Sequence, residues 1–209
     1  MSSRDEILRR LRAGKEIHRP SLIQDPDWDE LVFPFPENLV ETFVSELTQI
    51  FGKVTLIKDE VEFAKAIENE YVSRDWSSLF CLDKELTQIL RPTTIILENR
   101  DDKFLEMEVA LTPCEYLIAR SGTILVTSAG DSGRRLNVYP PIHLVYAKSS
   151  QLVPFLQNAI AGIEQRYKDD MPSLISFITG ASRTADIEKT LVMGAHGPKE
   201  LHVFLNIGA

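Results

Sequence analysis

Hydrophobic residues recur at helical and strand spacing in alternating segments through the first half of the chain. Between residues 37 and 52 they fall three to four positions apart, which predicts an amphipathic helix that ends at Gly52. The same spacing predicts helices at residues 61–71 and 84–90. Short apolar runs at 54–57 and 79–82 predict strands between them. Strands that alternate with helices indicate an α/β fold with an open, mostly parallel sheet flanked by helices.

The pattern changes after residue 115. Short runs at 116–119, 123–127, 138–139 and 142–147 are rich in β-forming residues and are separated by turns that contain glycine or proline. They predict a small β-hairpin insertion on the sheet. A helix is predicted at 149–163, with Pro154 in its first turn. The last run, 201–207, alternates apolar and polar residues, which predicts a two-faced strand at an edge of the sheet.

The N-terminal residues differ from the rest of the chain. The stretch from Ser3 to Glu6 has the form of a capping box, and a short helix is expected to follow and to end at Gly14. Residues 18–36 contain four prolines and show no period, which predicts an extended arm. We therefore expect an N-terminal helix and arm over residues 1–36, and one α/β domain over residues 37–209.

The chain is acidic, with a net charge of −8 and a pI near 5.1. This charge argues against a nucleic-acid partner and against binding to an anionic membrane surface. No apolar run approaches the roughly 20 residues that a membrane span requires. The first residues include acids and lack an apolar core of the signal-peptide type. We expect a cytoplasmic protein.

The two cysteines, Cys81 and Cys114, are far apart in the sequence. Iron–sulfur clusters and structural zinc sites usually take four ligands, often from paired cysteines. No histidines stand at metal-binding spacing, and no glycine-rich nucleotide fingerprint or G-x-S-x-G motif is present. The sequence therefore predicts no metal site and no cofactor, and the cysteines are expected to be reduced thiols.

The segment 178–199 carries the strongest candidate chemistry. It lies between the apolar runs 174–178 and 201–207, and its small residues predict a turn after a buried strand, then a short helix and a second turn. A helix start offers free backbone N–H groups to a carboxylate or phosphate. The hydroxyls of Thr179, Ser182 and Thr184 could instead only cap the helix. His196 could be a hydrogen-bonded turn residue, and Arg134 and Arg135 could belong to a solvated turn. The candidate ligand-binding residues are Thr179, Gly180, Ser182, Arg183, Thr184, Asp186, His196, Arg134 and Arg135.

Residues 179–188 and 194–203, which include Gly194-Ala-His-Gly-Pro198, resemble the C-terminal signature of the lactate utilisation protein C family (LutC/YkgG, with a LUD domain). Residues 117–125 and 136–145 are similar to the middle motifs of that family. The fold of the family is similar to that of glucosamine-6-phosphate deaminase, ribose-5-phosphate isomerase and the coenzyme A-transferases (NagB/RpiA/CoA-transferase-like). The resemblance implies the same open α/β sheet that the hydrophobic pattern predicts.

The resemblance also implies a function. The family is associated with a cytoplasmic system that oxidises L-lactate to pyruvate, and two other subunits of that system resemble iron–sulfur proteins. We expect an accessory or regulatory subunit that has no redox centre of its own. The alternatives are a stand-alone enzyme or binding protein for a small carboxylate or phosphorylated metabolite, and a homodimeric scaffold without a ligand. Many relatives have glutamate where this chain has Arg120. An arginine cannot serve as a carboxylate nucleophile, so chemistry through an acyl-glutamate is not expected at this position. No catalytic residue is carried over from the family.

Overall fold

The computed structural model of the chain describes residues 3–15, 35–185 and 191–208. The chain divides into two compact units, residues 1–34 and 35–209. In the first unit the described residues form helix α1 (Ser3–Lys15), which confirms the predicted N-terminal helix. The predicted arm lies almost entirely outside the described residues, and the domain boundary at residue 36 stays a prediction.

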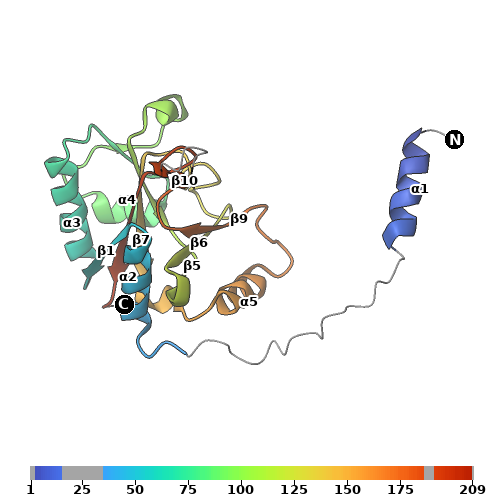
Figure 1. The fold of residues 1–209 in the computed structure, drawn as a ribbon. Coiled ribbons are helices and arrows are strands. Elements are labelled where there is room, and N and C mark those ends of the chain that lie inside the picture. The colour runs from blue at the N-terminus through green and yellow to red at the C-terminus, as the bar shows by residue number, and fades with distance from the viewer. Residues whose placement is uncertain (1–2, 16–34, 186–190, 209) are drawn as a thin grey trace. The chain divides into compact units, whose positions relative to one another are not determined.

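The second unit is built on a six-stranded sheet in which every neighbouring pair of strands runs parallel (Figure 1). The spatial order of the strands is β1-β12-β7-β4-β2-β3. This sheet confirms the predicted α/β fold. The strands are β1 (Gly52–Ile57), β2 (Leu79–Phe80), β3 (Leu97–Glu98), β4 (Val109–Pro113), β7 (Ile142–Lys148) and β12 (Glu200–Asn206).

Helices α3 (Glu60–Ser73) and α4 (Lys84–Leu90) cover one face of this sheet. Each begins at an aspartate, Asp59 or Asp83, whose side chain accepts a hydrogen bond from a backbone N–H of the first turn. The apolar face of α3, with Phe63 and Ile67 fully buried, packs on the strands. Burial of each such side chain stabilises the fold by about 1.5–3 kcal/mol.

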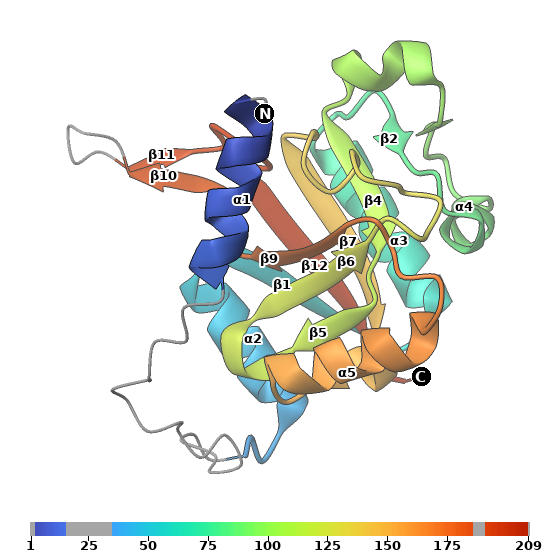
Figure 2. The same ribbon diagram turned by 90° about the vertical axis from the view of Figure 1, so that its right-hand side faces the viewer.

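A second layer covers the other face. It contains α2 (Leu39–Gln49) and a four-stranded sheet of order β8-β5-β6-β9, which confirms the predicted β insertion. Helix α5 (Leu156–Tyr167) packs on the outer side of the small sheet (Figure 2). The strands of the small sheet are β5 (Tyr116–Ile118), β6 (Thr123–Thr127), β8 (Leu152–Val153) and β9 (Ile175–Thr179). Short 3₁₀ helices lie at η1 (Asp101–Glu106), η2 (Ala119–Ser121) and η3 (Ser149–Gln151).

The C-terminal end of α2 approaches the backbone of the small sheet closely. A Cβ atom at Gly122 would lie 2.4 Å from the Leu47 backbone nitrogen, and one at Gly180 would lie 2.3 Å from the Ile50 carbonyl oxygen. Both glycines also have positive φ angles, 58° and 79°. The helix was predicted to end at Gly52, but Phe51 takes the left-handed conformation there, with φ 66°, and Gly52 begins β1.

Several sequence-based assignments are wrong in their place or type. The strand at 142–147 is the central β7 rather than part of the insertion, and residues 138–139 form a turn. The helix predicted at 149–163 begins only at Leu156, because η3 and β8 precede it. The last strand, β12, lies between β1 and β7 and not at an edge. The central strand β4 was not predicted.

The helix predicted within the signature segment is also wrong. The described residues there form an antiparallel pair, β10 (Arg183–Ala185) and β11 (Leu191–Met193). β9, which precedes them, pairs antiparallel with β6 in the small sheet, and its residues are half-buried or exposed rather than buried. In the part of the chain that the structure describes, no helix has the length and apolarity to cross a membrane.

Candidate functional site

The turn between β11 and β12 borders a hollow of about 480 Å³, which is lined in part by Tyr139, His196 and Lys199. The backbone N–H of Lys199 donates to the Pro141 carbonyl oxygen at 2.9 Å, which holds the turn beside the start of β7. The hollow therefore lies where β7 and β12 begin. A turn that follows a buried strand of an open parallel sheet would lie at the carboxyl ends of the strands, where ligands usually collect. That expectation is wrong, because β9 is antiparallel and the turn lies at the opposite edge of the large sheet.

The predicted ligand-binding residues are only partly brought together. The Ser182 N–H donates to the Pro198 carbonyl oxygen at 2.8 Å, so Ser182 lies against the turn that carries His196. The Arg183 guanidinium lies over the Phe51 ring, 5.4 Å from its centroid. Thr184 pairs with Val192 in the β-hairpin.

The remaining candidates point elsewhere. The Thr179 hydroxyl lies 2.9 Å from the Thr123 hydroxyl, and Gly180 packs on α2. Arg135 pairs with Asp101 at 2.6 Å, whereas Arg134 donates to the Ser173 hydroxyl at 2.5 Å. The two guanidinium groups thus have separate partners. Asp186 lies outside the described residues, and ligand binding by this set stays a prediction.

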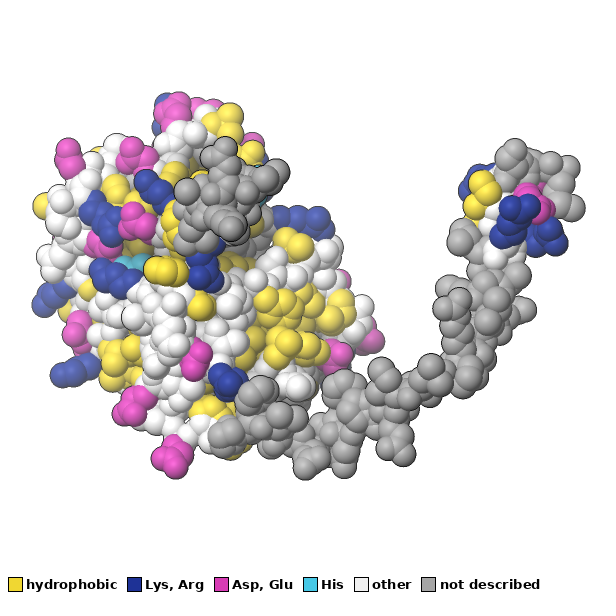
Figure 3. Space-filling model, viewed as in Figure 1, with side chains coloured by type: hydrophobic (Ala, Val, Ile, Leu, Met, Phe, Trp, Pro, Cys, Tyr) yellow, Lys and Arg dark blue, Asp and Glu magenta, His cyan; other side chains and the backbone are white. Residues whose placement is uncertain are grey.

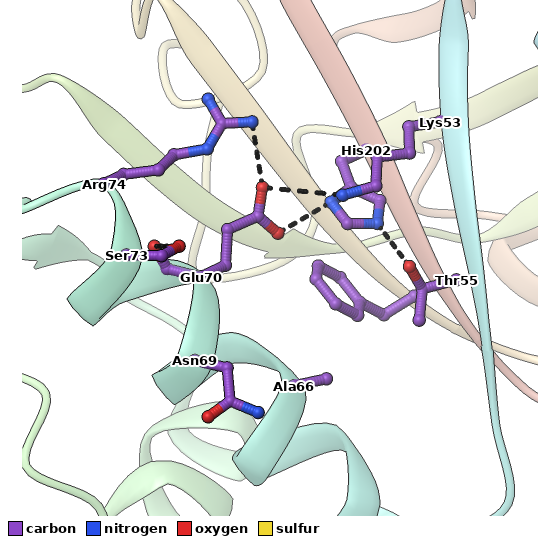
Figure 4. A pocket seen from close by; sticks show the side chains of 9 residues that line it. Lys53, Thr55, Ala66, Asn69, Glu70, Ser73, Arg74 and His202 are labelled. Atoms are coloured by element: carbon purple, nitrogen blue, oxygen red, sulfur yellow. Dashed lines mark hydrogen bonds and ion pairs between the residues drawn. The ribbon is translucent and has the colours of Figure 1, made fainter.

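A second hollow, of about 420 Å³, lies between α3 and the strands β1 and β12 (Figure 4). Its floor is formed by alternate residues of the two strands, because Lys53 is paired with His202 and Thr55 with Phe204 in the parallel register. Residues two apart on a strand face the same side of a sheet. The last turns of α3 form the wall. The hollow is lined by Lys53, Thr55, Ala66, Asn69, Glu70, Ser73, Arg74, His202 and Phe204.

His202 is at the centre of a polar network in this hollow. Its Nε2 atom lies 2.8 Å from the Thr55 hydroxyl, and its Nδ1 atom lies 2.9 Å from Glu70 Oε2. Figure 4 shows Glu70 and Thr55 on opposite sides of the imidazole. Arg74 then contacts Glu70 at 3.1 Å and Glu200 at 2.7 Å, and Lys53 lies 3.9 Å from Glu70.

Burial and charge set the protonation states of this network. Burial lowers the pKa of His202 below its ordinary value, and the neighbouring Glu70 carboxylate opposes this shift only in part. Burial acts to raise the pKa of Glu70, but the contact with His202 and the charges of Lys53 and Arg74 outweigh it, so this pKa is lowered. At neutral pH the imidazole is therefore neutral beside an ionised carboxylate.

The hollow is accessible although its central groups are covered. His202 is only 4% exposed, whereas the Arg74 and Lys53 side chains are 34% and 61% exposed. Figure 3 shows Lys, Arg, Asp and Glu side chains gathered around a histidine near α3 and β1. Sequence reasoning placed His202 in a strand but missed Thr55, Glu70 and Arg74. The available signal was the polar series His202 and Asn206 along one face of a strand that is otherwise apolar.

The thiols of Cys81 and Cys114 do not lie in a polar, accessible environment like that of His202. Burial raises the pKa of Cys81 to about 11, and burial also raises that of Cys114 strongly. Both thiols are therefore protonated at neutral pH and weak as nucleophiles or metal ligands. Among residues 3–15, 35–185 and 191–208, no group of three histidine, cysteine or acidic side chains is placed to hold a metal ion.

A family model described as the LUD domain matches residues 39–205, which is most of the chain. The chain belongs to the LUD domain family. The matched range includes all the residues that line the two hollows, so both are features of the LUD domain itself.

Individual relatives agree with this membership. The chain is 26% identical to Lactate utilization protein C 1 of Bacillus mycoides, over 95% of this chain and 94% of the relative. It is 28% identical to Lactate utilization protein C of Halalkalibacterium halodurans, over 92% of this chain and 90% of the relative. A solved DUF162 family protein from Deinococcus radiodurans superposes with a TM-score of 0.59 at 16% identity, covering 80% of this chain and 95% of that one. At that identity the structural match supports the fold of this LUD domain alone.

Proposed function

We propose that this LUD-domain protein acts in the utilisation of lactate in the cytoplasm. The observation that carries the proposal is similarity along more than nine-tenths of the chain to two proteins named for lactate utilisation. Similarity over the whole length, rather than over one motif, favours a shared role.

Within lactate utilisation, we propose that the chain is an accessory or regulatory subunit of an iron–sulfur system that oxidises L-lactate to pyruvate. The chain has two cysteines, fewer than the four that a cluster usually needs. The raised pKa values of both thiols further disfavour cluster ligation by this chain. The redox chemistry would then belong to partner subunits.

Two measurements in the native host test this role. Deletion of the gene should abolish growth on L-lactate and leave growth on pyruvate unchanged, and the wild-type gene should restore growth. Mild purification of the tagged chain should also recover iron–sulfur proteins with their visible absorbance. Unimpaired growth of the deletion strain on L-lactate would refute the role, whereas impaired growth without co-purification would refute only the accessory-subunit assignment.

A second proposal is that the hollow beside the signature turn binds a small carboxylate or phosphate. His196 and Lys199 line it, and Arg183, which carries a permanent positive charge, is paired on β10 with Met193, another lining residue. A ligand present at 100 times its dissociation constant stabilises the native state by about 2.7 kcal/mol. Lactate, pyruvate, sulfate or phosphate should therefore raise the melting temperature.

Variants locate that binding. His196→Ala and Arg183→Ala should each weaken the ligand-induced shift, because they remove a donor or a charge at this turn. Arg135→Ala is the matched control, since Arg135 is paired with Asp101 in another loop. An equal shift with sodium chloride at the same ionic strength would refute ligand binding, and loss of the shift in Arg135→Ala alone would move the site to that loop.

A further inference from the structure

The Thr55–His202–Glu70 network has one consistent assignment of hydrogen-bond donors and acceptors. His202 Nδ1 lies 2.9 Å from Glu70 Oε2, at ion-pair distance but without the geometry of a hydrogen bond. A lone pair on Nδ1 would face the ionised carboxylate, so this nitrogen carries the proton. The other nitrogen of a neutral imidazole, Nε2, then has a free electron pair. It must accept, and the Thr55 hydroxyl donates to it across 2.8 Å.

This arrangement is that of a nucleophile, a general base and an orienting acid. In hydrolases of unrelated folds, a hydroxyl donates to histidine Nε2, and a carboxylate on Nδ1–H fixes the tautomer and stabilises the imidazolium that forms. We propose that Thr55, His202 and Glu70 catalyse acyl transfer from a small, negatively charged ester to water. Thr55 is the nucleophile, His202 is the general base, and Glu70 is a positioning residue.

The proposed step needs no reactant besides the ester and water. The Thr55 oxygen attacks the acyl carbon while its proton moves to His202 Nε2. The bond from the acyl carbon to the leaving oxygen breaks, and His202 returns the proton to that oxygen. Water then gives a proton to His202 and attacks the acyl–threonine ester, and Thr55 leaves with the proton. No oxidation or reduction takes place.

The walls of the hollow indicate the class of substrate. A volume of about 420 Å³ suits a small molecule. Lys53 and Arg74 flank the network as ion-pair partners of Glu70. Both are partly exposed, and Lys53 lies 3.9 Å from Glu70, so a carboxylate on the substrate can approach the exposed side of these cations. Asn69 and Ser73 add polar contacts at the same rim. The site therefore favours an ester that bears a separate negative charge over a neutral one.

The test uses the full chain and the mono-para-nitrophenyl ester of adipic acid, with para-nitrophenyl acetate as the neutral comparison. We expect release of para-nitrophenolate, faster from the anionic ester, and a transient acyl group on the peptide that contains Thr55, seen by mass spectrometry. Thr55→Val should abolish both signals, and Thr55→Ser should retain them. His202→Gln should slow acylation by about 100-fold or more. Thr48→Ala is the matched control, because Thr48 is exposed on α2 and bonds only its own helix in the described structure.

The decisive part of a second measurement needs only the wild-type chain. Nitrogen-15 NMR of the wild-type chain should show His202 as a neutral ring with the proton on Nδ1, and Glu70→Gln should mix the two tautomers. If Thr55→Val released para-nitrophenolate at the wild-type rate and carried the acyl group on lysines, the proposal would be overturned. A His202 ring that carries its proton on Nε2 would also overturn it. The growth and co-purification tests of the lactate role use neither readout, so failure of one proposal is distinguishable from failure of the other.

Discussion

Acid should destabilise this protein through His143, a fully buried residue of β7. Its Nε2 atom lies 2.8 Å from the Thr112 hydroxyl, and among the described residues its Nδ1 atom has no hydrogen-bond partner. Burial lowers the pKa of His143 from 6.5 to about 4. The folded pKa is below the unfolded one, so between these values the unfolded chain binds more protons and folding weakens as pH falls. Above pH 6.5 the ring is neutral in both states and contributes no pH dependence.

The size of this effect follows from the two pKa values. Each unit of difference corresponds to about 1.4 kcal/mol once the unfolded state is protonated, so lowering the pH from about 7 to about 5 should cost about 2 kcal/mol through His143. With a urea slope of about 2 kcal/mol/M, the unfolding midpoint should fall by about 1 M. The variant His143→Gln does not titrate, and it should lack this part of the pH dependence.

The assay is urea unfolding of the wild type and of His143→Gln at both pH values. Comparing the two proteins cancels other groups, including His202, whose pKa is also lowered by burial. Acidic groups such as Glu98, with a pKa of about 2, titrate below this window. Equal losses of stability in the two proteins would refute the assignment to His143.

Three further outcomes are expected. Gly122→Ala should lower the melting temperature strongly, because it combines φ 58° with a Cβ 2.4 Å from the Leu47 nitrogen. Gly133→Ala, with φ 59° and nothing within 4 Å of the added Cβ, should lower the free energy of unfolding by only about 1 kcal/mol. Equal effects of the two substitutions would show that the close approach to α2 does not matter. Arg120→Glu should lose the contact with Glu46 at 3.7 Å and should not form a glutamyl thioester with acyl-coenzyme A; a trapped thioester would contradict this. Cys81, which is 3% exposed and has a pKa of about 11, should react with a thiol reagent at neutral pH much more slowly in the folded than in the urea-unfolded chain, and equal rates would contradict its burial.

Local periodicity was sufficient for elements whose signals lie within one segment. The helices α2, α3 and α4 each show an apolar face at helical spacing, and the last two begin at an aspartate that caps the first turn. The strands β1 and β6 are short apolar runs between clear turns. Burial of one face against any partner requires such a pattern, so it can be recognised without knowing the partner.

Sequence alone failed where a neighbour from elsewhere in the chain decides the outcome. β4 has only three consecutive apolar residues, Val109–Leu111, and is a strand because β2 and β7 pair with it on both sides. Residues 183–185 and 191–193 form a hairpin because each supplies the hydrogen-bond partners of the other, and helical spacing in the segment could not reveal that.

The candidate site shows the same division. The alternation of His202, Phe204 and Asn206 with apolar residues was visible in the sequence and predicted a two-faced strand. That strand is instead covered on both faces, and distant residues contact its polar side chains. Thr55 forms a hydrogen bond with His202 Nε2, Glu70 lies at ion-pair distance from His202 Nδ1, and Tyr146 accepts a hydrogen bond from Asn206. Sequence by itself therefore determined the α/β class and most of the elements. Only the tertiary structure brought His202 next to Glu70 and Thr55, because contacts between residues more than 100 positions apart leave no local pattern.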